Sequence, residues 1–128
     1  MSTLPPDPRF RETHVGEWQG LTADEIETNW PGYLDSHRRP PGFEDDASII
    51  ARVGFALTEL AVAFPGEEVL CIAHAGVLRV MRRHLGVPDR RIPNLGGCHF
   101  TVRPGVDPLF EVGEIVELFE HGEIGEEL

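Results

Sequence analysis

A short apolar run that leads through a histidine into an amphipathic helix constrains the fold of this chain more than any other feature. The run covers residues 68–73 and ends at His74, and residues 75–85 then repeat apolar side chains at helical spacing. A continuous apolar run of this length is typical of a strand covered on both faces. Gly86 follows the helix in the position of a C-terminal cap. We therefore expect a strand–helix unit inside an α/β domain.

The other segments favour the same fold class. Thr22 and Glu25 form a capping box, which predicts a short helix that ends near Trp30. Residues 47–64 repeat apolar side chains every three or four positions, which predicts a long amphipathic helix. Alternating apolar residues predict strands over 97–103 and 109–118. Residues 1–20 are expected to be irregular, with at most a short extended piece near Phe10, and residues 120–128 to form an acidic tail.

Helical spacing also predicts which faces are buried. In the long helix the expected buried face contains Ile50, Val53, Leu57, Leu60, Ala61 and Phe64. In the helix over 75–85 it contains Val77, Leu78, Met81 and Leu85. Arginines at positions 79, 82 and 83 are expected on the solvated face of that helix.

Length and charge exclude several classes of function. A chain of 128 residues fits one domain over residues 1–128, with enough length for a hydrophobic core. It contains 22 acidic residues against 11 cationic ones, all of them arginine, for a net charge of −11. This charge disfavours binding to nucleic acids or to anionic membranes. The absence of lysine excludes a P-loop and Schiff-base catalysis.

Cysteine content and hydropathy predict where the protein resides. Two cysteines are too few for a disulfide framework, and neither a signal peptide nor an apolar run long enough for a membrane helix is visible. We therefore expect a cytoplasmic protein.

The first candidate site is the junction at His74, Ala75 and Gly76. The N-terminus of a helix that follows a strand offers unpaired N–H groups and the positive end of the helix dipole to an anion. Small residues allow a phosphate or carboxylate to come close to the backbone, and the imidazole can donate a hydrogen bond or carry charge. The alternative is a histidine that only caps the strand and bonds to a carbonyl.

The second candidate site is the loop over residues 9–20, which contains Glu12 between glycine-rich turns and near Trp18. A partly desolvated carboxyl group can serve as a general acid, because desolvation raises its pKa toward neutrality. The alternative is a solvated carboxylate paired with Arg9 or Arg11.

Both units occur in order within a larger pattern. A Pro-Gly-Phe-Glu loop follows at 41–44, then Arg52 in the long helix, then the run from 69 to 79, and finally Asn-Leu-Gly-Gly-Cys at 94–98. This pattern resembles the histidine phosphatase superfamily, the phosphoglycerate mutase-like enzymes, over roughly residues 7–104. The resemblance implies a three-layer α/β/α sandwich without a metal or other cofactor. It also implies that Glu12 is the general acid and that His74 contacts the transferring phosphoryl group.

The same resemblance implies that an important segment has no counterpart here. Family members begin with a strand that ends in Arg-His-Gly, whose histidine is phosphorylated and whose arginine holds the phosphate. We therefore expect the first strand and first helices to be absent, leaving the C-terminal two-thirds of a domain of roughly 200 residues. Glu-His-Gly at 120–122 resembles a permuted copy of that triplet, but a glutamate in the place of the arginine would repel phosphate.

The expected function is a phosphomonoesterase or phosphoryl-transfer domain for a small phosphorylated metabolite, impaired without its nucleophile. Arg9 and Arg11, with the backbone of Ala75 and Gly76, are the residues expected to contact the substrate. No metal site is expected, because the histidines and cysteines lack zinc-ligand spacing. One alternative is an interaction module that forms a homodimer through an exposed sheet edge. Another is a full enzyme whose true start lies upstream.

Overall fold

The computed structural model describes residues 3–117, and within that range it contains three α-helices, two single-turn 3₁₀ helices and two strands. Their bounds are η1 Pro8–Phe10, η2 Gly16–Trp18, α1 Ala23–Asn29, α2 Asp46–Ala63, α3 Ala75–His84, β1 Gly96–Val102 and β2 Phe110–Glu117. The mixed α/β class and each predicted helix and strand are confirmed, except the strand at 68–73. The acidic tail at 120–128 lies outside the described residues.

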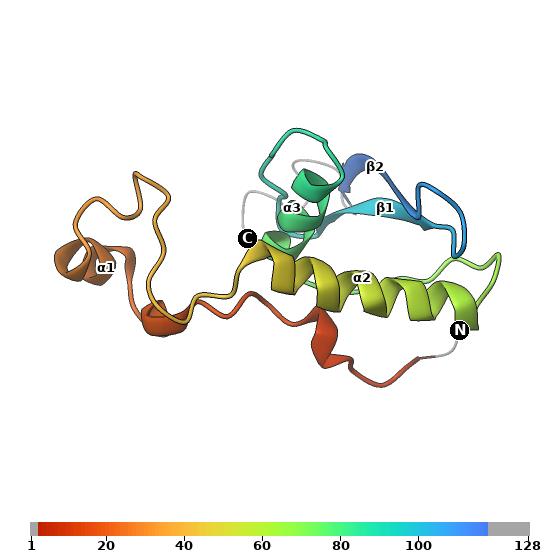
Figure 1. Cartoon of the computed structure of the whole chain (residues 1–128), viewed down its shortest axis with the longest axis horizontal. Coiled ribbons are helices and arrows are strands. Elements are labelled where there is room, and N and C mark those ends of the chain that lie inside the picture. Colours follow the sequence, from red (N-terminus) through yellow and green to blue (C-terminus); the bar gives the residue numbers. More distant parts are fainter. Residues whose placement is uncertain (1–2, 118–128) are drawn as a thin grey trace.

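The long helix α2 forms one wall of the core. Asp45 caps it by accepting a hydrogen bond of 2.8 Å from the backbone N–H of Ser48. Figure 1 shows α2 lying beneath α3 and the β1–β2 sheet. The buried face of α2 is rotated by about one residue from the predicted face. Its fully buried members are Ile49, Val53, Gly54 and Ala56, whereas Ile50 and Leu57 pack at the margin of the core.

The helix α3 supplies the opposite wall of the core with Val77, Val80 and Met81. Arg82 was expected on the solvated face of α3, but it is only 5% exposed. The prediction was wrong because the Nη1 atom of Arg82 donates a hydrogen bond of 2.7 Å to the carbonyl of Gly113 in β2. This contact joins the helix to the sheet, and Gly86 with φ of 84° follows the end of the helix as expected.

The two strands form an antiparallel hairpin that closes one side of the core. Cys98 lies opposite Ile115 and Phe100 lies opposite Val112, with a bulge between the two pairs. Phe100 packs at the margin of the core cluster. The ring of Phe110 faces Gly54 of α2, where a side chain on the helix would meet it.

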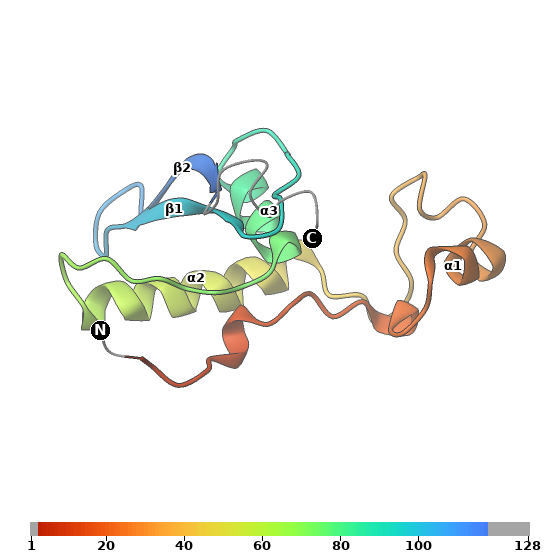
Figure 2. The same cartoon turned by 180° about the vertical axis from the view of Figure 1, so that it is seen from behind.

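The segment at 68–73 corrects the prediction of a central strand. It forms no strand, and Leu70 and Ile72 are 77% and 86% exposed. Figures 1 and 2 show it as an open trace that returns along α2 toward α3. A strand exists through its hydrogen-bonded neighbours, and none of the residues from 3 to 117 provides one here.

The N-terminal segment is also more tightly turned than expected. Residues 8–10 form a 3₁₀ turn in place of an extended piece, because the Asp7 carboxylate accepts a hydrogen bond of 2.9 Å from the backbone N–H of Arg9. The turn places Phe10 against the core formed by α2 and α3.

Residues 16–42 form an excursion that leaves the body and returns beside its own start, and it carries α1 at its far end (Figure 1). Val15 and Phe43 form an antiparallel bridge at its base, and the N–H of Glu17 donates to the carbonyl of Pro41. Gly16 has φ of 59°, and a Cβ there would collide with that carbonyl oxygen. Only glycine therefore fits this crossing.

None of the described helices is both long enough and apolar enough to span a membrane.

Candidate functional site

The site is built around the N-terminus of α3. His74 is the N-cap residue, with extended backbone angles and no hydrogen bond from its side chain to the helix end. Its carbonyl already accepts the first helical hydrogen bond, from the N–H of Leu78. Among residues 3–117, the first N–H groups of the helix have no hydrogen-bond partner, so they and the imidazole are open to a ligand.

Glu12 comes to this helix end from a distant part of the chain. Its Oε2 atom lies 3.7 Å from Nδ1 of His74, and both side chains are about half exposed, at 50% and 52%. Its Oε1 atom accepts a hydrogen bond of 2.9 Å from the N–H of Thr13. The structure thus joins the two residues that the sequence identified as separate candidates.

Gly76 makes this approach possible. A Cβ at position 76 would lie 3.0 Å from Oε1 of Glu12, which is tighter than ordinary contact. The sequence predicted that a small residue here would admit an anion, and the carboxylate of Glu12 is the anion found beside it. A carboxylate beside a helix N-terminus is electrostatically favoured.

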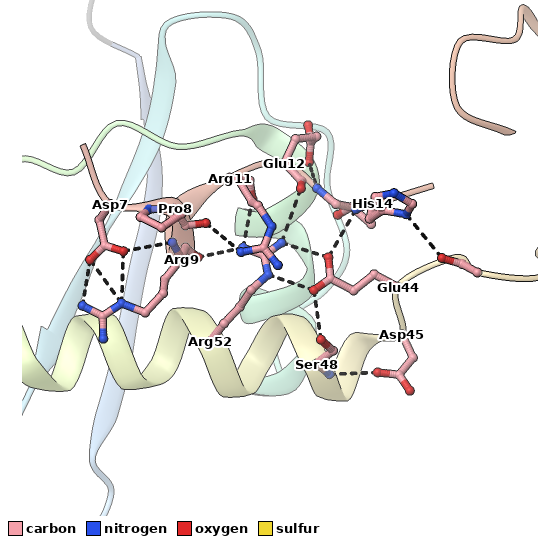
Figure 3. Close-up of polar contacts among 12 residues, drawn as sticks. Asp7, Pro8, Arg9, Arg11, Glu12, His14, Glu44, Asp45, Ser48 and Arg52 are labelled. Carbon is pink, nitrogen blue, oxygen red and sulfur yellow. Dashed lines mark hydrogen bonds and ion pairs between the residues drawn. The ribbon is translucent and has the colours of Figure 1, made fainter. Parts of the chain in front are cut away.

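Arg52 of α2 holds the loop that carries Glu12. Its Nη1 atom donates hydrogen bonds of 2.7 Å and 2.9 Å to the carbonyls of Arg9 and Arg11, and Nη2 lies 3.5 Å from the carbonyl of Glu12. Figure 3 shows this guanidinium directly beneath the loop. One side chain on α2 thus holds three carbonyls of the loop that carries Glu12.

Glu44 holds Arg52 in turn. The two side chains are 8% and 10% exposed and share two hydrogen bonds, of 2.8 Å and 3.0 Å. Glu44 also accepts hydrogen bonds from the N–H of His14 and the hydroxyl of Ser48 (Figure 3). These donors, the Arg52 guanidinium first among them, lower the pKa of Glu44 to about 2. We call Arg52 and Glu44 the loop brace.

Sequence reasoning did not assign a role to the loop brace. Arg52 and Glu44 entered only as members of a longer pattern. A usable signal was present, since Arg52 is the one cationic residue of the predicted long helix and stands eight residues after a glutamate, which suggests a partnered charge.

The two arginines predicted to bind substrate lie elsewhere. Arg9 is paired at 2.7 Å with both Asp7 and Glu59, which raises the pKa of its guanidinium, and it lies over the ring of Phe55. Figure 3 shows Arg9 turned toward Asp7 and away from the carboxylate of Glu12. Arg11 donates to the carbonyl of Pro8. Neither side chain is held against the pair formed by Glu12 and His74.

Trp18 does not flank the acid as the sequence suggested. It packs edge to face against Trp30 and Phe43, with ring centroids 6.3 Å and 5.8 Å away. Its role is to close the base of the excursion. Within residues 3–117, no three histidine, cysteine or acidic side chains gather closely enough to hold a metal ion.

The sequence profile of the histidine phosphatase superfamily (branch 1) matches residues 2–102. The chain belongs to this superfamily. The match includes Glu12, Arg52 and His74, so the paired residues and their brace all lie within the histidine phosphatase region.

Curated proteins similar to this chain include two from mycobacteria. Glucosyl-3-phosphoglycerate phosphatase from Mycobacterium tuberculosis (strain CDC 1551 / Oshkosh) is 32% identical over 105 residues, which cover 71% of this chain and 47% of the relative. The protein of the same name from Mycolicibacterium vanbaalenii is 31% identical over 104 residues, covering 71% and 46%. The chain therefore spans about half the length of these histidine phosphatase relatives.

A solved structure has a similar fold. Mycobacterial hydrolase 1 has a TM-score of 0.60 and 28% sequence identity to this chain, and the similarity covers 84% of this chain and 61% of that one. The helices and sheet described above are thus a partial histidine phosphatase fold.

Proposed function

We propose that this chain carries one half of a phosphomonoester site, in which Glu12 gives a proton to the leaving group and His74 contacts the phosphoryl oxygens. The single observation that supports this proposal is the meeting of Glu12 with His74 at 3.7 Å beside the free end of α3. A carboxyl group, an imidazole and backbone N–H groups together supply the proton and the charge stabilisation that phosphoryl transfer requires.

The proposed reaction breaks the bond between phosphorus and the ester oxygen. As that bond lengthens, negative charge develops on the leaving oxygen, and a protonated Glu12 would neutralise it by proton transfer. His74 and the N–H groups of α3 would stabilise the charge on the equatorial oxygens. The loop brace would keep the carboxyl of Glu12 at the required distance from the helix end.

We infer that the 128-residue chain alone turns over phosphomonoesters very slowly. Its sequence contains no Arg-His-Gly triplet, so the phosphorylated histidine and the arginine beside it that the superfamily uses have no counterpart. Arg9 and Arg11 are engaged with Asp7, Glu59 and Pro8 and do not replace that arginine at the site. Loss of such electrostatic groups costs orders of magnitude in rate.

The proposed substrate class is a small phosphorylated metabolite. The curated relatives are named for glucosyl-3-phosphoglycerate, a phosphate ester that also carries a carboxylate. We extend to this chain the class of compound and not the compound itself, since the loops that select substrates vary most among relatives.

Binding of inorganic phosphate tests the site directly. In an NMR titration of the ¹⁵N-labelled chain, phosphate is expected to shift the amide signals of Ala75, Gly76 and Val77, and His74→Gln is expected to remove the effect. His84→Gln, an exposed histidine at the other end of α3, serves as the matched control and is expected to preserve it. No shift at these amides, or equal loss in both variants, would contradict the proposed site.

Turnover tests the separate claim of impairment. The purified chain is expected to hydrolyse p-nitrophenyl phosphate no faster than its His74→Gln variant. A chimera that adds the part of the M. tuberculosis relative outside the matched region is expected to be active, and Glu12→Gln should lower its kcat by about 10²- to 10⁴-fold. Substantial turnover by the chain alone would sink the impairment claim, and an unchanged kcat in the Glu12→Gln chimera would sink the role of Glu12.

A further inference from the structure

Residues 68–73 carry a row of backbone groups that find no hydrogen-bond partner in the part of the chain that the structure describes. Among residues 3–117, no backbone–backbone or side-chain hydrogen bond involves any N–H or carbonyl of this segment. The last backbone bond before it is donated by Glu67 to Phe64, and the next is accepted by His74. An extended segment with free backbone groups is a template for pairing with another strand.

The side chains of the segment alternate as those of a half-buried strand do. Leu70 and Ile72 are 77% and 86% exposed, whereas Val69 is 42% exposed and Cys71 is only partly exposed. Residues of even number therefore face outward and those of odd number face the body of the protein. The outward row consists of Leu70 and Ile72, with the exposed residues Glu68 and His74 at its two ends, and the imidazole of His74 also faces Glu12.

We propose that two copies of this chain pair antiparallel through residues 68–74, in the register that places Leu70 of each copy opposite Ile72 of the other. Directly opposed residues in a ladder point to the same face of the sheet. The outward residues of the two copies therefore lie opposite each other only when an even-numbered residue pairs with an even-numbered one. This register satisfies that rule and places Cys71 opposite Cys71 on the two-fold axis.

The charges on the segment select a second copy in this register. Glu68 at one end lies opposite His74 at the other end, and the two-fold axis forms this pair twice. Shifting the register by two residues in one direction opposes Glu68 to Ile72, and in the other direction opposes Leu70 to His74. The chosen register is the one in which apolar residues meet apolar residues and the carboxylates meet the imidazoles, so Glu68 of the second copy and phosphate would compete for His74. A two-fold symmetric contact of this kind closes on itself and leads to a dimer.

Sedimentation velocity over a range of chain concentrations tests the pairing, and it does so independently of any phosphatase activity. The native chain is expected to shift from monomer to dimer as concentration rises. Leu70→Lys and Ile72→Lys are expected to weaken association at least tenfold, because charge on an edge strand opposes pairing. Both side chains are exposed, so the variants should retain the fold, which circular dichroism checks.

Val62→Lys is the matched control. Val62 is 64% exposed on α2, so this change adds the same charge at an exposed apolar position outside the segment. It is expected to leave the association unchanged. A chain that stays monomeric at every concentration would overturn the proposal, and so would a dimer that Ile72→Lys leaves intact or that Val62→Lys weakens equally.

Cross-linking tests the register. Opposed residues in an antiparallel pair have Cα atoms about 4.5–5.5 Å apart, within the range that a disulfide spans. In a Cys98→Ser background, diamide should therefore join Cys71 to Cys71, each thiol giving up one proton and one electron to the reagent. Cys71→Ser in the same background removes every thiol and should give no covalent dimer. A dimer sensitive to Ile72→Lys that never cross-links through Cys71 would overturn the proposed register.

Discussion

Replacing Arg52 with methionine is expected to destabilise the protein by about 3 kcal/mol at neutral pH. The substitution keeps much of the apolar stem and removes the guanidinium that Glu44 and three loop carbonyls share. Glu44 then remains as a carboxylate that is 8% exposed and without its counter-ion. Breaking a buried pair from one side costs several kcal/mol, because the remaining charge stays desolvated.

The magnitude follows from the pKa of Glu44. The donors around it lower that pKa from an ordinary 4.5 to about 2. Each unit of pKa corresponds to 1.36 kcal/mol, so the interactions of the charged form are worth about 3 kcal/mol. Since the pKa is depressed in the folded state, this stability is fully present above pH 4.5 and is lost as pH falls toward 2. The deficit of the Arg52→Met variant should therefore shrink across the same interval.

Urea unfolding followed by circular dichroism measures this effect. A double-mutant cycle of Arg52→Met with Glu44→Gln should give a coupling free energy of up to about 3 kcal/mol at pH 7, since the His14 N–H and the Ser48 hydroxyl supply part of the pKa shift. Arg79→Met is the control, because Arg79 and Asp89 form an exposed pair, 40% and 39% exposed, whose loss should cost at most about 1 kcal/mol. A coupling under about 1 kcal/mol between Arg52 and Glu44, or a deficit that does not change from pH 7 to pH 3, would refute the reasoning.

Two further substitutions test the site and the start of α2. Gly76→Ala should stabilise α3 by up to about 1 kcal/mol and yet displace the Glu12 carboxylate, because the new methyl group would lie 3.0 Å from its Oε1 atom. Urea unfolding measures the change in stability. The amide signal of Thr13, whose N–H donates to that oxygen, reports the displacement of the carboxylate. A Thr13 signal that does not move would contradict the displacement. Asp45→Ala should cost about 1 kcal/mol through loss of the cap on the Ser48 N–H, and an unchanged unfolding midpoint would show that the cap contributes nothing.

Local signals in the sequence were sufficient for the helices and for the two strands of the hairpin. The capping box at Thr22 and Glu25 forms as predicted, with both of its hydrogen bonds present. The strands over 96–102 and 110–117 follow their apolar alternation. Helix caps and periodicity depend on residues within one or two turns, so they can be read from a single chain.

Features that depend on distant neighbours were harder to predict. The segment at 68–73 has the composition of a buried strand, but strand formation requires a partner that composition does not specify. Arg82 resembled a solvated arginine because its acceptor, the carbonyl of Gly113, lies in a different element. For the site, sequence identified Glu12, His74 and Gly76, but it could not show that Asp7 and Glu59 engage Arg9.

The base of the excursion over residues 16–42 separates a part of the chain that can vary in length from the part that positions Glu12. Its two ends meet at the bridge between Val15 and Phe43. On the body side of that bridge, Glu44 donates its N–H to the carbonyl of His14. The loop brace lies on the body side of this closure. The length and composition of the excursion can therefore change during evolution without moving Glu12, provided that the chain returns to the same crossing point. Insertions and substitutions in such a closed loop can change the surface beside the site while Glu12 and His74 keep their positions.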